Sequence, residues 1–188
     1  QFEYMERAAQ RLRIVVPVTL LIIFLLLYLN FRNISEPLVV MLSIPFGLIG
    51  GFWLVYWLGF NLSVAVAVGF IALAGVAAEI GVLVLTFIDH ELARCRHDKA
   101  GVVRLNAREI MQAVHRGASE RVRPIAMTAT AIIGGLLPIM WSSGTGSGLM
   151  QRIAAPMVGG MVSVTILSLL VLPVIYGLVL QWQEHRRS

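Results

Sequence analysis

Residues 62–88 read LSVAVAVGFIALAGVAAEIGVLVLTFI, an apolar run that contains one charged residue, Glu79. About 20 consecutive apolar residues are enough to cross the hydrocarbon core of a bilayer as an α-helix. The run is continuous rather than alternating, which argues against the short amphipathic strands of a membrane β-barrel. Residues 62–88 are therefore predicted to span a membrane as a helix.

Four further apolar runs have the same character, and they cover about residues 14–31, 38–58, 124–141 and 153–180. The chain is 58% hydrophobic and 13% charged, whereas a soluble domain is usually about one quarter charged. This composition excludes a soluble globule, a disordered tail and a nucleic-acid-binding module. The sequence thus predicts an all-α, polytopic membrane helix bundle with five transmembrane helices.

The distribution of Arg and Lys predicts the orientation of these spans, because both residues are enriched on the cytoplasmic side. If the turn at 32–37, the segment 89–123 and the C-terminus share one side of the membrane, that side holds eleven of the fifteen Arg and Lys residues. The C-terminus is then cytoplasmic and the N-terminus is outside. Residues 1–13 are interpreted as the end of a preceding translocated region, and 14–188 as the membrane bundle. The alternative is a five-span protein with a trimmed start.

The long basic loop 89–123 is expected on the cytoplasmic side. Within it, Ile110, Met111 and Val114 share one helical face, and Gly117 ends the run. This pattern predicts a short amphipathic helix on the membrane surface, or a solvated linker helix.

Small residues inside the spans predict close approaches between helices, since membrane helices associate where small side chains let backbones touch. Gly47 and Gly51 have the GxxxG spacing. Further expected points of close approach are Gly134, Gly135, Gly159 and Gly160.

Glu79 is the candidate functional residue, because a charged carboxylate in the middle of a span costs at least a few kcal/mol if it is unpaired. Such residues usually belong to an ion pathway or a proton relay. The alternative is a protonated Glu that bonds a neighbouring helix. No other acid or base is expected at that depth, so a complete relay or an intramembrane enzyme site is absent from this chain and Glu79 needs a partner from elsewhere.

Met150 is the second candidate. It follows the Gly-rich segment 142–148 and precedes Arg152, at the expected outer mouth of the bundle. A thioether there can bind a soft ion such as Cu(I) or Ag(I), although packing is the commoner role of Met.

Several runs of the sequence resemble the C-terminal membrane half of the resistance-nodulation-division (RND) efflux transporters, in particular the copper/silver pumps of the heavy-metal branch. The matching runs are 70–81 (FIALAGVAAEIG), 121–124 (RVRP), 126–128 (AMT), 135–139 (GLLPI) and 150–160 (MQRIAAPMVGG).

The resemblance implies that the five spans are the last five of such a transporter and that a periplasmic pore domain precedes Gln1. It implies a homotrimer in the bacterial inner membrane that docks a periplasmic adaptor and an outer-membrane channel. It also implies a secondary active transporter that exchanges protons for metal, with no resident cofactor.

The resemblance implies roles for two residues of this chain, and at a third position the sequence differs from the family. Glu79 matches the family's proton-relay Glu, and Met150 matches a Met of its metal conduit. Copper/silver pumps have Lys where this chain has Ile125. An aliphatic side chain cannot carry a proton, so a relay here uses another partner, works with fewer groups, or is defective.

The sequence therefore predicts the C-terminal part of a proton-driven efflux transporter for Cu(I)/Ag(I). Two alternatives remain: a pump for divalent cations or organic compounds, and a five-span membrane protein that does not transport.

Overall fold

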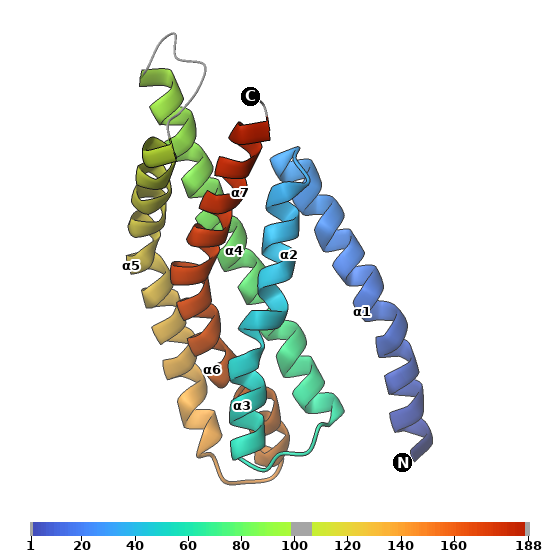
Figure 1. Ribbon diagram of the computed structural model, residues 1–188. Helices are drawn as coiled ribbons and strands as arrows, with labels where there is room; N and C mark the ends of the chain where they lie inside the picture. The colour runs from blue at the N-terminus through green and yellow to red at the C-terminus, as the bar shows by residue number, and fades with distance from the viewer. Residues whose placement is uncertain (1, 99–106, 187–188) are drawn as a thin grey trace.

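The computed structural model describes residues 2–98 and 107–186, which form helices joined by short turns (Figure 1). The elements in chain order are α1 (Phe2–Phe31), α2 (Ser35–Gly47), α3 (Ile49–Trp57), α4 (Val64–Asp98), α5 (Ala107–Met140), α6 (Ser147–Ile166), the π-helical segment η1 (Leu167–Val171) and α7 (Leu172–Arg186). No strand occurs in this part of the chain.

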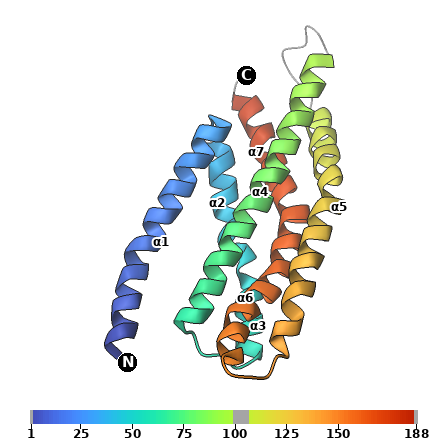
Figure 2. The same ribbon diagram turned by 180° about the vertical axis from the view of Figure 1, so that it is seen from behind.

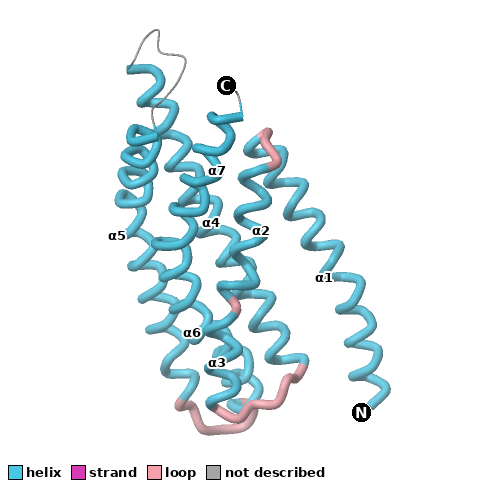
Figure 3. The backbone as a smooth tube through the Cα atoms, viewed as in Figure 1, coloured by secondary structure: helices cyan, strands magenta, loops and turns pink. Residues whose placement is uncertain are grey.

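Five stretches are long and apolar enough to cross a membrane: Ile14–Phe31, Ser35–Trp57, Val64–His97, Arg108–Met140 and Ser147–Trp182. The predicted all-α bundle of five transmembrane helices is confirmed. The second span combines α2 and α3, and the fifth combines α6, η1 and α7. The turns gather at the two ends of the bundle (Figure 3).

Both composite spans are interrupted near a proline. Proline has no backbone N–H and its ring crowds the carbonyl four residues earlier, so it disturbs the regular helical ladder. Pro173 lies just after η1, and the wider π-helical turn accommodates the disturbance. Pro45 lies in the last turn of α2, just before the break at Leu48.

The break between α2 and α3 is filled by a side chain from α6. The hydroxyl of Ser163 accepts a hydrogen bond from the backbone N–H of Gly50 at 3.2 Å, and its one proton is within reach of the carbonyls of Gly47 and, in its own helix, Gly160. A polar side chain inserted into the helical ladder is a recognised cause of a helix kink. The insertion satisfies backbone groups that have no water to bond in a membrane interior.

Glycine contacts bring α6 against α3 and α4. A Cβ on Gly50 would overlap the carbonyl oxygen of Gly159, and a Cβ on Gly160 would overlap the side chain of Leu73. Gly47 and Gly51 are similarly crowded, so four of the predicted close approaches are confirmed. Two glycines of α5, Gly134 and Gly135, make no such contact with the described residues. Both face outward, and a Cβ added to either would meet nothing within 4 Å.

The basic segment 89–123 differs from the predicted surface helix. α4 continues to Asp98, and α5 begins at Ala107 and runs without interruption into its span. Gly117 does not end a helix; it lets α5 approach α4, since a Cβ there would lie 2.8 Å from the Cα of Ile88. Residues 99–106 of this segment lie outside the described residues.

α1 stands apart from the other spans. It packs near α2 at one end of the bundle and diverges from it toward its N-terminus (Figures 1 and 2). Only 6% of the residues in its span are buried, against 44% in the span of α4. From Phe2 onward, the segment expected to end a preceding region continues directly into this helix.

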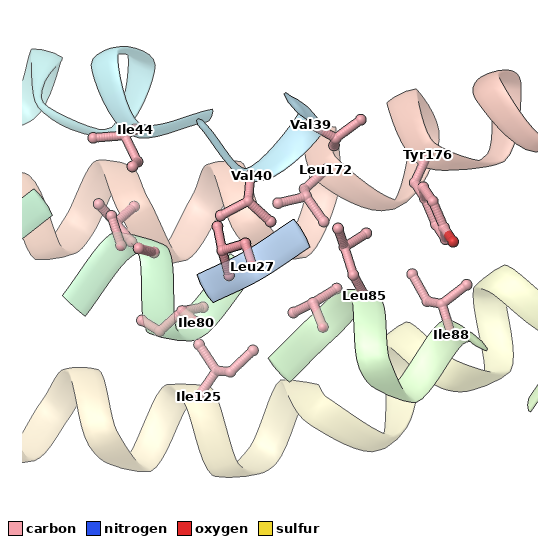
Figure 4. Packing of buried hydrophobic residues seen from close by; sticks show 14 of the residues in the cluster. Leu27, Val39, Val40, Ile44, Ile80, Leu85, Ile88, Ile125, Leu172 and Tyr176 are labelled. Atoms are coloured by element: carbon pink, nitrogen blue, oxygen red, sulfur yellow. The ribbon is translucent and has the colours of Figure 1, made fainter. Parts of the chain in front are cut away.

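The hydrophobic core lies against one face of α4. Ile80, Leu85 and Ile88 of α4 lie between side chains of the other spans (Figure 4). Those partners include Leu27, Val40, Ile125, Leu172 and Tyr176. One face of α4 is thereby held by four other spans, which leaves its opposite face open.

We expect Gly50→Ala to destabilise the protein. Its new methyl group would overlap the backbone of α6, and overpacking of this kind typically costs about 1–3 kcal/mol. Thermal unfolding of the purified polypeptide in detergent measures the effect. The matched control is Gly135→Ala, which adds a methyl in open space and removes a helix-interior glycine, so we expect unchanged or higher stability. Equal stability of the two variants would contradict the proposed contact.

Candidate proton and metal sites

Glu79 lies on the outward face of α4. Its neighbours in sequence, Ala78 and Ile80, are buried, whereas Glu79 itself is exposed. Ala72, Gly75 and Thr86 are exposed as well, and their spacing places them on the same helical face. Figure 2 shows α4 with α1 on one side and α5 on the other.

The face around Glu79 carries the small residues Ala72, Gly75 and Thr86 together with the larger Val68. A Cβ added to Gly75 would meet nothing within 4 Å. No described residue forms a hydrogen bond or ion pair with the Glu79 carboxylate. This face therefore has the small side chains that permit close helix packing, and none of the described spans covers it.

Ile125 of α5 points into the core rather than toward a polar partner. It is 3% exposed and belongs to the same apolar cluster as Ile80, which it faces in Figure 4. Ile125 lies fifteen residues before the end of α5, and Glu79 lies fifteen residues after the start of α4. Because both helix ends lie at the same end of the bundle, Ile125 and Glu79 are at similar depth (Figure 1).

Met150 lies in the first turn of α6 and is 56% exposed. The preceding turn is shaped by Gly144 and Gly146, both with positive φ, and is closed by a hydrogen bond from Gln151 Nε2 to the carbonyl of Ser142 at 2.9 Å. The Met150 thioether is thus presented at the surface on an ordered turn.

The structure does not bring Met150 and Glu79 together. Met150 lies in the first turn of α6, and α6 and α4 begin at the same end of the bundle (Figure 1). At 1.5 Å of rise per residue, Glu79 is about 22 Å further along α4. The two candidates therefore form separate sites.

A polar cluster that the sequence-based prediction missed lies at the opposite end. The hydroxyl of Tyr176 contacts Glu36 Oε1 at 3.2 Å and also hydrogen-bonds Asp89 Oδ1. Asn33 Nδ2 donates to the same Glu36 oxygen at 3.2 Å. The antiparallel order of the spans could have placed Glu36 and Asp89 at one end, because one begins a span and the other ends one.

Comparison with known proteins gives a consistent result. The model of the AcrB/AcrD/AcrF family matches residues 1–180. The chain is 49% identical over its whole length to the cation efflux system protein CusA of Escherichia coli O157:H7, and 47% identical to the putative cation efflux system protein SilA of Salmonella typhimurium. It is 40% identical to the cobalt-zinc-cadmium resistance protein CzcA of Cupriavidus metallidurans.

A solved structure has the same fold. The X-ray crystal structure of a heavy metal efflux pump superposes with a TM-score of 0.81 at 34% identity, over 96% of this chain and 16% of that one. The chain likewise spans only 18% of the CusA and SilA sequences. These matches confirm the predicted resemblance to the heavy-metal branch of the RND transporters. Since the family model covers residues 1–180, the chain belongs to the AcrB/AcrD/AcrF family.

Proposed function

We propose that this chain is the C-terminal membrane part of a proton-driven heavy-metal efflux transporter whose cargo is Cu(I) or Ag(I). The observation that carries the proposal is the position of Glu79, a carboxylate in the middle of a span, on an exposed face of α4 that no described helix covers. The similarity to cation efflux proteins over the whole chain supports it.

Glu79 would couple protons to helix movement through the cost of desolvating its charge. An ionised carboxylate is costly in an apolar environment, whereas the protonated form is tolerated. Packing of another helix over the face of Glu79 therefore favours the protonated state, and separation favours the ionised state. Protons taken up on one side and released on the other would shift the bundle between these two arrangements.

The partner of Glu79 in this proposal lies on a span outside this chain. Ile125 cannot serve, because its side chain is aliphatic and is buried against Ile80. The proton relay would then use groups of the earlier spans in place of the Lys found in copper/silver pumps.

Met150 would form one station of a metal conduit, with its thioether as a soft ligand for a monovalent ion. Its exposure on the ordered turn before α6 leaves the sulfur accessible.

The assembly and the orientation belong to the same proposal. The excess of Arg and Lys at the C-terminal end of the bundle favours a cytoplasmic location for that end, in a bacterial inner membrane. By similarity, the complete polypeptide would form a homotrimer that engages a periplasmic adaptor and an outer-membrane channel.

We expect Glu79→Gln in the complete polypeptide to abolish silver resistance, reducing growth to that of cells without the transporter. Gln keeps the shape of the protonated side chain but cannot release a proton. The measurement is growth in a silver dilution series, with trimer assembly checked by size-exclusion chromatography. Glu120→Gln on α5, which changes an exposed carboxylate, is the control and should retain resistance. Full resistance in the Glu79 variant would refute the relay.

Met150→Leu should lower silver resistance several-fold, because Leu fills similar volume but has no ligand atom. Growth under silver is again the measurement. Met111→Leu is the matched control, since the Met111 sulfur lies beside α7 and packs near Gly177. If both variants behave like the unmodified protein, Met150 has a packing role.

A divalent-cation pump is the second candidate. The 40% identity to CzcA and the aliphatic Ile125 favour it. We expect expression of the complete polypeptide in a metal-sensitive strain to protect against silver and copper. Protection against zinc or cobalt alone would instead establish the second candidate, and protection against none of these metals would favour a protein that does not transport.

A further inference from the structure

The polar cluster around Tyr176 joins three spans at the end of the bundle near the C-terminus. It consists of Asn33 in the α1–α2 turn, Glu36 of α2, Asp89 of α4 and Tyr176 of α7, and is called the Tyr176 cluster below. Glu36 is 4% exposed and Tyr176 is 1% exposed. Glu36 and Tyr176 are 140 residues apart in sequence, so the cluster is a tertiary contact.

The hydrogen bonds of the cluster do not balance if both carboxyl groups are ionised. A tyrosine hydroxyl has one proton to donate, and an ionised carboxylate can only accept. Tyr176 contacts an oxygen of Asp89 and an oxygen of Glu36. If Tyr176 donates its proton to one of these carboxylates, its oxygen is left facing an oxygen of the other carboxylate with no hydrogen between them. One additional proton on a carboxyl group turns that contact into a second hydrogen bond.

The burial of the Glu36 carboxyl group also favours an additional proton in the cluster. The second carboxyl oxygen of Glu36, Oε2, is buried and has no hydrogen-bond partner. An unpaired buried acceptor costs about 1–3 kcal/mol, and more if it is charged. Glu36 also lines a cavity of about 200 Å³, large enough for water, since one water occupies about 30 Å³ in the liquid. Ionising Glu36 would leave a charged oxygen unpaired, and the cavity gives water a path along which a proton can reach the cluster.

The charges around the cavity accommodate one negative charge more readily than two. Glu36 lies in the first turn of α2, where the helix dipole favours an anion. Asp89 lies in the C-terminal part of α4, where the dipole offers no such support. Arg96 of α4 is the only cation among the described residues that line the cavity, while Phe31 and Leu180 contribute apolar walls from α1 and α7.

We infer that the Tyr176 cluster is a proton-binding site, in which Glu36 and Asp89 share one exchangeable proton through the Tyr176 hydroxyl. The proton is taken from solvent and returned to it. When it leaves, two neighbouring carboxylates repel each other, and the contact between α2, α4 and α7 weakens. The cluster thus acts as a proton-dependent latch between these spans.

This site is separate from Glu79. Asp89 follows Glu79 by ten positions on α4, which corresponds to about 15 Å along the helix. The inference rests on the hydrogen bonds and burial of the Tyr176 cluster and holds whether or not Glu79 carries protons.

Infrared spectroscopy of the complete polypeptide in lipid nanodiscs tests the inference. The parent protein carries Glu79→Gln, so that Glu79 contributes no signal. A protonated carboxylic acid has a C=O stretching band distinct from the bands of a carboxylate. We expect the spectrum of the parent minus that of Glu36→Gln, or minus that of Asp89→Asn, to show this band at neutral pH, with the area of one carboxyl group per chain.

Two control variants make the test decisive. Glu120→Gln should leave the band unchanged, because that carboxylate is exposed. Tyr176→Phe should shift the frequency of the band, since it removes a hydrogen-bond partner without removing a carboxyl group. If Glu36→Gln does not assemble, the Asp89→Asn difference alone decides. Absence of the band from the difference spectra of all assembled carboxyl variants would overturn the inference, whatever the result of the resistance assay with Glu79→Gln.

Discussion

The hydroxyl of Ser163 contacts the backbone N–H of Gly50 and the backbone carbonyl of Gly47, at the point where α2 ends and α3 begins. In a membrane interior no water can bond such groups, so an interrupted helix is stable only where a neighbour supplies the missing partner. That neighbour is α6, and the glycines beside Ser163 bring its backbone into contact with α3. The interior face of α4 packs against α6 and α5 in turn, and this packing decides which residues of α4 point outward.

The outward direction of Glu79 follows from this packing. Ala78 and Ile80 are both buried, and each is about 100° from Glu79 around the helix on opposite sides, so Glu79 points away from the core. The exposed residues on that side and the sparse burial of α1 show that faces of both helices are uncovered among the described spans. The chain spans only 18% of the CusA sequence and 16% of the crystallised heavy metal efflux pump.

The bundle treats its carboxyl groups in two ways. Glu79 has no hydrogen-bond or ion-pair partner among the described residues. Glu36 and Asp89 are joined by one tyrosine and tie the α1–α2 turn to α4 and α7. The uncovered position of Glu79 suits a carboxyl group whose neighbours change as helices move. The buried arrangement of Glu36, Asp89 and Tyr176 suits a contact between helices whose strength depends on one proton.

Hydropathy alone determined the number of spans, the helical class and the depth of Glu79, because each depends only on a local run of apolar residues. The motifs around Glu79 and Met150 were also sufficient for the family. The tertiary structure decided which glycines are crowded, that α5 is one continuous helix past Gly117, and that Tyr176 meets Glu36 and Asp89. These features depend on how each helix is rotated about its axis against its neighbours, and that rotation is a property of packing between distant segments rather than of any local pattern.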